Sequence, residues 1–240
     1  MGPKDERHTY HMEQGKSKDL GVLIKGFLAL LIMLALIFLI AGRIDYWQGW
    51  IFGIVNFFIV LALFIKFSDI SEIMRERAKP GSETKWWDKL FWAFFGPMNL
   101  AILIIASLDA GRFHWSPSLP LFIYPLGYVV YLFSSSLHFW AIRVNRFYSS
   151  TVSIQNEKGQ EVIQSGPYRF VRHPGYLGIG LMVVCIALVL GSVWALVPAF
   201  CVVVLLTIRT ALEDSALLQE LSGYAAYAKK VRHRLLPKIW

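Results

Sequence analysis

The chain has 240 residues, of which 56% are hydrophobic and 15% aromatic, while only 17% are charged. Soluble domains are roughly half apolar, so this composition indicates a bilayer as the solvent. The formal net charge of +8 does not predict nucleic-acid binding, because the cations lie between apolar runs and not together on one soluble face. Cys185 and Cys201 lie within separate apolar runs, which predicts neither a disulfide nor a metal site.

Residues 1–19 are polar and mixed in charge, and they predict a disordered tail with too little apolar surface to order itself. His8 and His11 in this tail are half a metal site at best. The apolar runs that follow predict transmembrane helices, since each approaches the roughly 20 residues that cross a hydrocarbon core. These runs, 20–41, 46–67, 90–108 and 119–142, make 20–142 a region of four spans. The first run lacks a small-residue cleavage site, so it is expected to remain as an anchor.

The last apolar region, 174–209, is too long for one crossing and is interrupted by Gly191 and Ser192. It predicts a helical hairpin whose two halves are each about 26 Å long at 1.5 Å per residue. Such a hairpin returns Arg209 to the membrane face at which His173 lies. The predicted fold is therefore all-α and integral to the membrane, with about six transmembrane helices.

Lysine and arginine are distributed unevenly between the loops. Segments 1–25, 75–89, 143–172 and 229–238 contain five each, whereas the intervening loops contain Arg43, Arg112 or none. Short cytoplasmic loops are enriched in these residues, so both termini and the polar carboxyl-terminal segments are predicted to be cytoplasmic. The membrane would be the plasma membrane of a prokaryote or the endoplasmic reticulum of a eukaryote.

The segment GPYRFVRHPGYLG, at 166–178, places polar side chains directly before an apolar run. Proline after His173 disfavours a helical conformation at that histidine and suits the first helical position, so a helix is predicted to begin at Pro174. Unpaired N–H groups would then face the membrane surface, and His173 and Tyr176 could converge on one ligand. A closely packed membrane helix, whose glycines only permit helix contact, is an equally good interpretation.

Arg209 and Glu213 are four residues apart and so share a helix face. An ionisable residue at membrane depth favours a functional role, although a snorkelling arginine in an interfacial ion pair is the alternative. The apolar spacing from residue 217 to 231 predicts a carboxyl-terminal amphipathic helix, interrupted at Gly223, for which packing is expected more than ligand binding.

Four linked segments resemble the isoprenylcysteine carboxyl methyltransferases and their relatives among the phospholipid methyltransferases. They are QNEKGQEVIQSGPY at 155–168, RHPGY at 172–176, RTALED at 209–214 and GYAAYAKKVRHRLLP at 223–237. The resemblance implies a membrane enzyme with a catalytic region at 143–240, formed by a cytoplasmic loop, the hairpin 174–209 and the amphipathic segment. It implies that S-adenosylmethionine contacts Gln155, Gln160, Glu161, Val162, Ile163, Tyr168, His173, Pro174, Gly175, Tyr176 and Glu213. Arg209 matches the arginine associated with the substrate, and Arg209 and Glu213 form the expected catalytic pair.

The chemistry of the residues agrees with this implication. Glu213 can receive the cofactor ammonium, and helix N-terminal amides after Pro174 can receive its carboxylate. The family often has two glutamates where this chain has Glu213 and Asp214, which leaves the role of Asp214 open.

The expected acceptor is a lipidated carboxylate, most simply an isoprenylcysteine α-carboxyl group that becomes a methyl ester. A carboxylate is ionised at neutral pH and needs no general base. N-methylation of a phospholipid amine such as phosphatidylethanolamine is the main alternative, and it requires a base. An NADPH-dependent protein similar to the sterol reductases and a non-enzymatic membrane sensor are further alternatives. The oligomeric state is left open.

Overall fold

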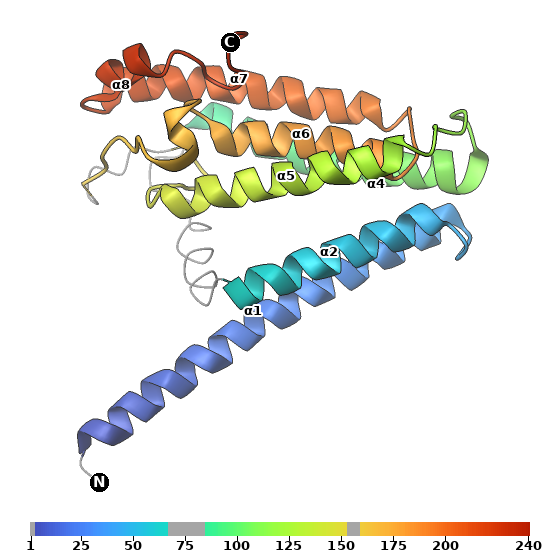
Figure 1. Cartoon of the computed structure of the whole chain (residues 1–240), viewed down its shortest axis with the longest axis horizontal. Helices are drawn as coiled ribbons and strands as arrows, with labels where there is room; N and C mark the ends of the chain where they lie inside the picture. The colour runs from blue at the N-terminus through green and yellow to red at the C-terminus, as the bar shows by residue number, and fades with distance from the viewer. Residues whose placement is uncertain (1–2, 67–84, 153–158) are drawn as a thin grey trace.

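The computed structural model describes residues 3–66, 85–152 and 159–240, and within these ranges the chain is helical with no strand. Helices α1 and α2 form an antiparallel pair, while α5, α6 and α7 lie side by side with α4 behind them (Figure 1). The predicted all-α class is therefore confirmed. The helices are α1 (Pro3–Ala41), α2 (Trp47–Lys66), α4 (Trp86–Ala106), α5 (Ile123–Val144), α6 (Pro174–Val189), α7 (Leu196–Glu220) and α8 (Tyr224–Lys230).

Four helical stretches are long and apolar enough to cross a membrane: Leu23–Ala41, Trp47–Ile65, Trp86–Phe113 and Leu196–Glu220. Helix α6 is apolar but has only 16 residues. Helix α5 has 22 residues but is not among the four, and it contains several serines and a histidine. Two of the six predicted spans, those formed by α5 and α6, thus stay predictions.

The observed helix bounds differ from the predicted ones at two places. Helix α1 begins at Pro3, so the segment predicted to be a disordered tail is helical from that residue. That segment contains six lysine, arginine and glutamate residues, whose high helix propensity allows the helix to extend beyond its apolar part. Helix α4 continues past the predicted end of the third span as a π-helix, Ser107–Phe113.

The predicted helical hairpin is present in the structure. Helices α6 and α7 pack together, and the turn between them contains Gly191 with a φ of +82°, a conformation that glycine adopts without steric cost. The Ser192 hydroxyl in the same turn donates to the buried Asp109 carboxylate at 2.5 Å. Helix α7 does not end at Arg209 but continues to Glu220. Its last turns therefore project past the start of α6.

Close packing of α5 on α6 fixes the position of the RHPGY segment. A Cβ atom at Gly178 would lie 2.8 Å from the Ser134 carbonyl oxygen, so only glycine permits this approach. The contact holds the first turn of α6 against the carboxyl-terminal half of α5.

Glycine also interrupts the predicted amphipathic segment. Gly223 has a φ of +82° and separates α7 from the short helix α8. The apolar side chains on either side of it form a buried cluster of their own, as their spacing predicts. This cluster contains Leu221, Tyr224, Tyr227 and Val231.

Candidate active site

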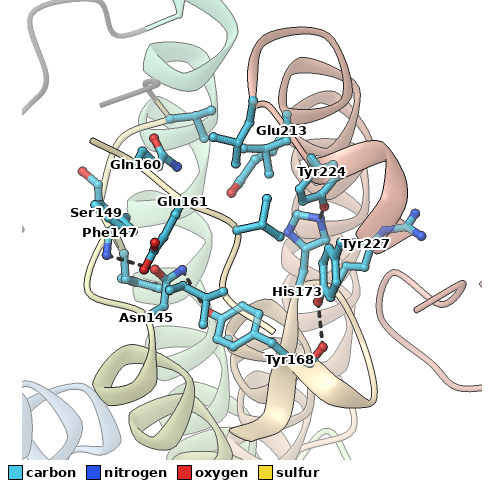
Figure 2. A pocket seen from close by; sticks show the side chains of 18 of the residues that line it. Asn145, Phe147, Ser149, Gln160, Glu161, Tyr168, His173, Glu213, Tyr224 and Tyr227 are labelled. Atoms are coloured by element: carbon cyan, nitrogen blue, oxygen red, sulfur yellow. Dashed lines mark hydrogen bonds between the residues drawn. The ribbon is translucent and has the colours of Figure 1, made fainter. Parts of the chain in front are cut away.

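A polar cavity lies at the end of the helices where α6 begins (Figure 2). It contains about 840 Å³ of empty space, part of which is open to solvent. Of the residues predicted to contact the cofactor, Gln160, Glu161, Val162, Ile163, Tyr168, His173, Gly175, Tyr176 and Glu213 line it. Pro174 is the first residue of α6 beside them, as predicted. Gln155 lies outside the described residues.

His173, Tyr176 and Glu213 meet on one side of this polar cavity. The rings of His173 and Tyr176 are parallel, with centroids 5.8 Å apart and an interplanar angle of 3°. The Tyr176 hydroxyl donates to Glu213 Oε2 at 2.5 Å. Glu213 Oε1 has no hydrogen-bond partner within the described ranges, so one oxygen of the carboxylate is fixed and the other is available to a ligand.

Three further polar side chains line the polar cavity. The Tyr227 hydroxyl donates to the Tyr168 backbone oxygen at 2.7 Å, and Asn145 Nδ2 donates to the Tyr168 hydroxyl at 3.3 Å. Burial raises the pKa of Tyr168 and of Tyr227, so both remain neutral phenols at physiological pH. The sequence motifs alone do not identify Asn145 or Tyr227 as site residues. The available signal for Asn145 was its position, because it is the first amide side chain after the predicted span 119–142 and lies where the expected cofactor loop begins.

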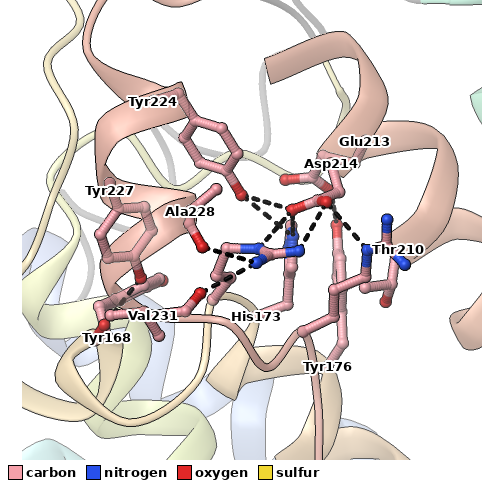
Figure 3. A network of polar contacts seen from close by, with 12 residues as sticks. Tyr168, His173, Tyr176, Thr210, Glu213, Asp214, Tyr224, Tyr227, Ala228 and Val231 are labelled. Carbon is pink, nitrogen blue, oxygen red and sulfur yellow. Dashed lines mark hydrogen bonds and ion pairs between the residues drawn. The ribbon is translucent and has the colours of Figure 1, made fainter. Parts of the chain in front are cut away.

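Asp214 is the centre of a buried polar network behind His173 (Figure 3). Arg172 donates to both of its carboxylate oxygens, from Nε at 2.8 Å and Nη2 at 2.9 Å. Arg234 Nε donates at 2.9 Å and the Tyr224 hydroxyl at 2.7 Å, while His173 Nε2 lies 3.2 Å from Oδ1. Burial, together with the charge of Asp214, raises the pKa of Tyr224, so this hydroxyl remains a donor. The second acid of the RTALED segment therefore organises the motif and does not line the cavity.

The carboxyl-terminal segment 231–234 runs along the RHPGY segment. The backbone N–H groups of Arg172 and His173 donate to the carbonyl oxygens of His233 and Arg234, each at 2.9 Å. Arg172 Nη1 also donates to the Val231 carbonyl oxygen at 2.9 Å. His173 is thus held by its backbone as well as by the Asp214 network.

A second, apolar cavity adjoins the polar one. It contains about 970 Å³ of empty space including the part open to solvent, and aromatic and aliphatic side chains form most of its wall. Its lining residues are Phe91, Trp92, Phe95, His138, Ile142, Tyr148, Ser149, Ser150, Tyr176, Ile179, Leu206 and Arg209. Tyr148, Ser149 and Tyr176 line both cavities. Arg209 and Glu213 share a face of α7 as predicted, but they border different cavities on the two sides of Tyr176.

Arg209 is an internal residue of the bundle and not a snorkelling arginine, because only 4% of its side chain is exposed. Its Nη2 lies 2.8 Å from Asp88 Oδ1 and donates to the Ser150 carbonyl oxygen at 2.7 Å. The guanidinium carbon lies 4.2 Å from the centre of the Phe91 ring. Its Nε–H is buried and has no hydrogen-bond partner in the described part of the chain. A buried donor without a partner is costly, and a ligand is one explanation for it.

Asp88, the partner of Arg209, was not predicted from the sequence. Asp88 is fully buried in the first turn of α4, where its Oδ2 also accepts from the Val152 backbone N–H at 3.1 Å. The available signal was a single acid next to a predicted apolar span. An acid that is buried there needs a cationic partner, so its position indicated an ion pair.

The fold and the two cavities define an all-helical protein, with helices apolar enough to span a membrane, in which a polar and an apolar site meet. Residues 126–219 match the model of the isoprenylcysteine carboxyl methyltransferase (ICMT) family. The matched segment runs from α5 almost to the end of α7 and includes three of the four segments that carry the resemblance, which is thereby confirmed. The match to this family indicates methyltransferase activity. Comparison with curated proteins gives no match.

Proposed function

We propose that the protein is a membrane methyltransferase that converts the α-carboxylate of an isoprenylcysteine to its methyl ester, with S-adenosylmethionine as the methyl donor. The observation that carries this proposal is the junction of the polar and apolar cavities at Tyr148, Ser149 and Tyr176. A water-soluble cofactor needs a polar site and a lipid acceptor needs an apolar one. The two sites must adjoin, because the methyl group passes directly from one molecule to the other.

The residues of the polar cavity fit S-adenosylmethionine. Glu213 Oε1 is available to an ammonium group, and the first N–H groups of α6 have no partner within their helix and suit a carboxylate. Tyr168 and Tyr176 offer aromatic faces for adenine or for a cationic sulfur. When bound, the cofactor supplies an electrophilic methyl group on a sulfonium. Gln155, Gln160 and the segment 161–163 would complete the site from the loop.

The residues of the apolar cavity fit a lipidated carboxylate. The unpartnered Nε–H of Arg209 is a charge-assisted donor in apolar surroundings, which is the environment in which such a hydrogen bond is strongest. Phe91, Trp92 and Leu206 offer apolar surface for the lipid. Asp88 balances the charge of Arg209 when no acceptor is bound, as buried charges require. Catalysis would then rest on holding the carboxylate at the boundary of the two cavities, since positioning alone accounts for a large part of such a rate.

The arrangement in the membrane is part of the proposal. Helices α5 and α6 would span the bilayer with the four longer apolar stretches, and both cavities and both termini would be cytoplasmic. The unequal distribution of lysine and arginine supports this arrangement.

A direct assay tests the proposed reaction. Purified protein in lipid nanodiscs would be given S-adenosylmethionine labelled in its methyl group and a prenylated cysteine carboxylate. Base-labile methyl in the lipid fraction indicates an ester, whereas base-stable methyl on phosphatidylethanolamine would indicate the amine alternative. Saturable binding of NADPH, with none of S-adenosylhomocysteine, would contradict both in favour of a reductase.

A further inference from the structure

A third cavity lies at the other end of the bundle from the two described above. It forms where the α1–α2 connection, the segment that follows the π-helix and the turn between α6 and α7 come together (Figure 1). The length of α6, about 24 Å at 1.5 Å per residue, separates it from the polar cavity. It contains about 860 Å³ of empty space, part of which is open to solvent. Neither the sequence motifs nor the proposed reaction uses this cavity.

Two polar side chains converge in this third cavity. Tyr124, in the first turn of α5, is only 9% exposed, and Gln48 lies in the first turn of α2. A Cβ atom at Gly191 would lie 3.1 Å from Gln48 Nε2 and 3.2 Å from the Tyr124 hydroxyl oxygen, so both groups face the same turn. Neither side chain forms a hydrogen bond within residues 3–66, 85–152 and 159–240. Polar groups so placed need a partner from outside the chain.

The acidic and basic side chains of the third cavity carry no net charge. Arg43 donates to both carboxylate oxygens of Asp45, at 2.6 Å and 2.7 Å. Arg43 Nη1 also lies 3.3 Å from His114 Nε2. A guanidinium only donates, so this ring nitrogen must accept and the imidazole is neutral. An anionic ligand would find no unpaired cation in this wall, whereas a ligand without net charge is matched by it.

The third cavity lies at the ends of two candidate membrane spans. The apolar stretches Leu23–Ala41 and Trp47–Ile65 end and begin at its wall. Trp47 and Leu121 line it and are 42% and 80% exposed. Tryptophan is enriched at the level of the lipid headgroups, where every phospholipid has a phosphodiester. The oxygens of a phosphodiester only accept hydrogen bonds, so they complement the two unpartnered donors of the cavity.

We propose that the third cavity binds the headgroup of a zwitterionic phospholipid, whose phosphodiester accepts hydrogen bonds from the Tyr124 hydroxyl and the Gln48 amide. Because these donors belong to α5 and α2, the lipid joins the α1–α2 pair to the rest of the bundle. It is a structural component at the end of the protein away from the proposed chemistry, and it is not a methyl acceptor.

Two tyrosines of α5 give a matched pair of variants. Tyr124→Phe removes a hydroxyl that faces the third cavity. Tyr128→Phe, one helical turn further along, removes a buried hydroxyl that also lacks a partner in the described part of the chain but lines none of the three cavities. Both substitutions keep the aromatic ring, so a purely structural effect of losing a hydroxyl would appear in both. Gln48→Leu removes the second donor at similar side-chain volume.

The experiment titrates delipidated protein in a polyoxyethylene detergent and counts bound lipids by native mass spectrometry. The main probe is dioleoylphosphatidylcholine. Dioleoylglycerol has the same chains without the phosphate, glycerophosphocholine has the headgroup without the chains, and dioleoylphosphatidylglycerol has an anionic headgroup. We expect the unmodified protein to bind one phosphatidylcholine about tenfold more tightly than any of the other three, the range of a hydrogen bond to a charged group. Tyr124→Phe and Gln48→Leu should each weaken this binding about tenfold, and Tyr128→Phe should not change it.

Equal binding of phosphatidylcholine and dioleoylglycerol would overturn the inference, because the headgroup would then not be recognised. Preference for phosphatidylglycerol would contradict the zwitterionic assignment, and equally tight binding of glycerophosphocholine would indicate a soluble ligand in place of a lipid. Equal losses of affinity in Tyr124→Phe and Tyr128→Phe would show that the hydroxyl acts through the fold and not through the lipid. Absence of any tightly bound phosphatidylcholine would also overturn the inference.

Discussion

The guanidinium of Arg209 and the carboxylate of Asp88 form a buried ion pair, with Nη2 2.8 Å from Oδ1. This pair joins α7 to the first turn of α4 beside the apolar cavity, while leaving Arg209 Nε without a partner in the part of the chain that the structure describes. A guanidinium can bond to Asp88, to the Ser150 carbonyl oxygen and to a ligand at the same time because its donors point in fixed, different directions.

Arg209→Lys tests whether this geometry matters. A lysine ammonium keeps the charge opposite Asp88 but cannot reproduce a planar fork of donors. We expect a folded variant that binds S-adenosylhomocysteine normally and loses about tenfold or more in turnover of a prenylcysteine carboxylate, equivalent to roughly 1.4 kcal/mol. Arg43→Lys is the control, because Arg43 pairs with Asp45 at an exposed position. Turnover close to that of the unmodified protein would show that Arg209 does not hold the acceptor.

Glu213→Gln tests the assignment of the cofactor ammonium. The substitution keeps the shape and the acceptor for the Tyr176 hydroxyl but removes the negative charge. Loss of one charge-assisted hydrogen bond should weaken S-adenosylhomocysteine binding by about 1.5 to 3 kcal/mol in a calorimetric titration. Glu220 lies on α7 like Glu213 and forms an ion pair with Lys85 before α4, so Glu220→Gln should leave the affinity unchanged. Equal affinities of the two variants would remove Glu213 from the cofactor site.

Asp214→Asn tests the buried network. The amide leaves Arg172 and Arg234 without their charge partner, and breaking a buried ion pair costs on the order of 3 to 5 kcal/mol. We expect a clear fall in thermal unfolding temperature in detergent. Asp45→Asn breaks an exposed pair and should cost about 1 kcal/mol or less. If the Asp214 network did not stabilise the fold, Asp214→Asn and Asp45→Asn would give similar unfolding temperatures.

The proposed topology predicts the result of cysteine-accessibility labelling. Single cysteines at Ser17 and Lys238 should react from the cytoplasmic side, and one at Ser118 from the opposite side. The background protein would have Cys185 and Cys201 replaced, since the latter is exposed. Reaction of the Ser17 label from outside would reverse the arrangement and place both cavities on the other face.

The helices and most of the polar cavity could be predicted because their signals are local. Pro174 sets a helix start, Gly191 and Gly223 set interruptions, and the four-residue spacing of Arg209 and Glu213 sets a shared face. These depend on backbone geometry within a few residues and need no knowledge of the fold.

The partners of those residues could not be predicted, since they come from distant parts of the chain. Asp88 reaches Arg209 from another helix, and Arg234 reaches Asp214 from the carboxyl-terminal segment. Gly178 lies against Ser134 and His138 of α5 because it has no side chain, which lets α5 and α6 approach closely. Pairing of this kind follows from how helices pack, and one sequence contains no direct record of it.

The attachment of segment 231–234 to the RHPGY segment also bears on how the protein is made. Arg172 and His173 emerge from the ribosome about 60 residues before the carbonyl groups that receive their backbone N–H bonds. The helices can therefore insert and pack before the cofactor motif has its final support. Assembly of the polar cavity is thus a late event of biosynthesis, and a nascent chain still lacking these residues would have a bundle without a finished binding site.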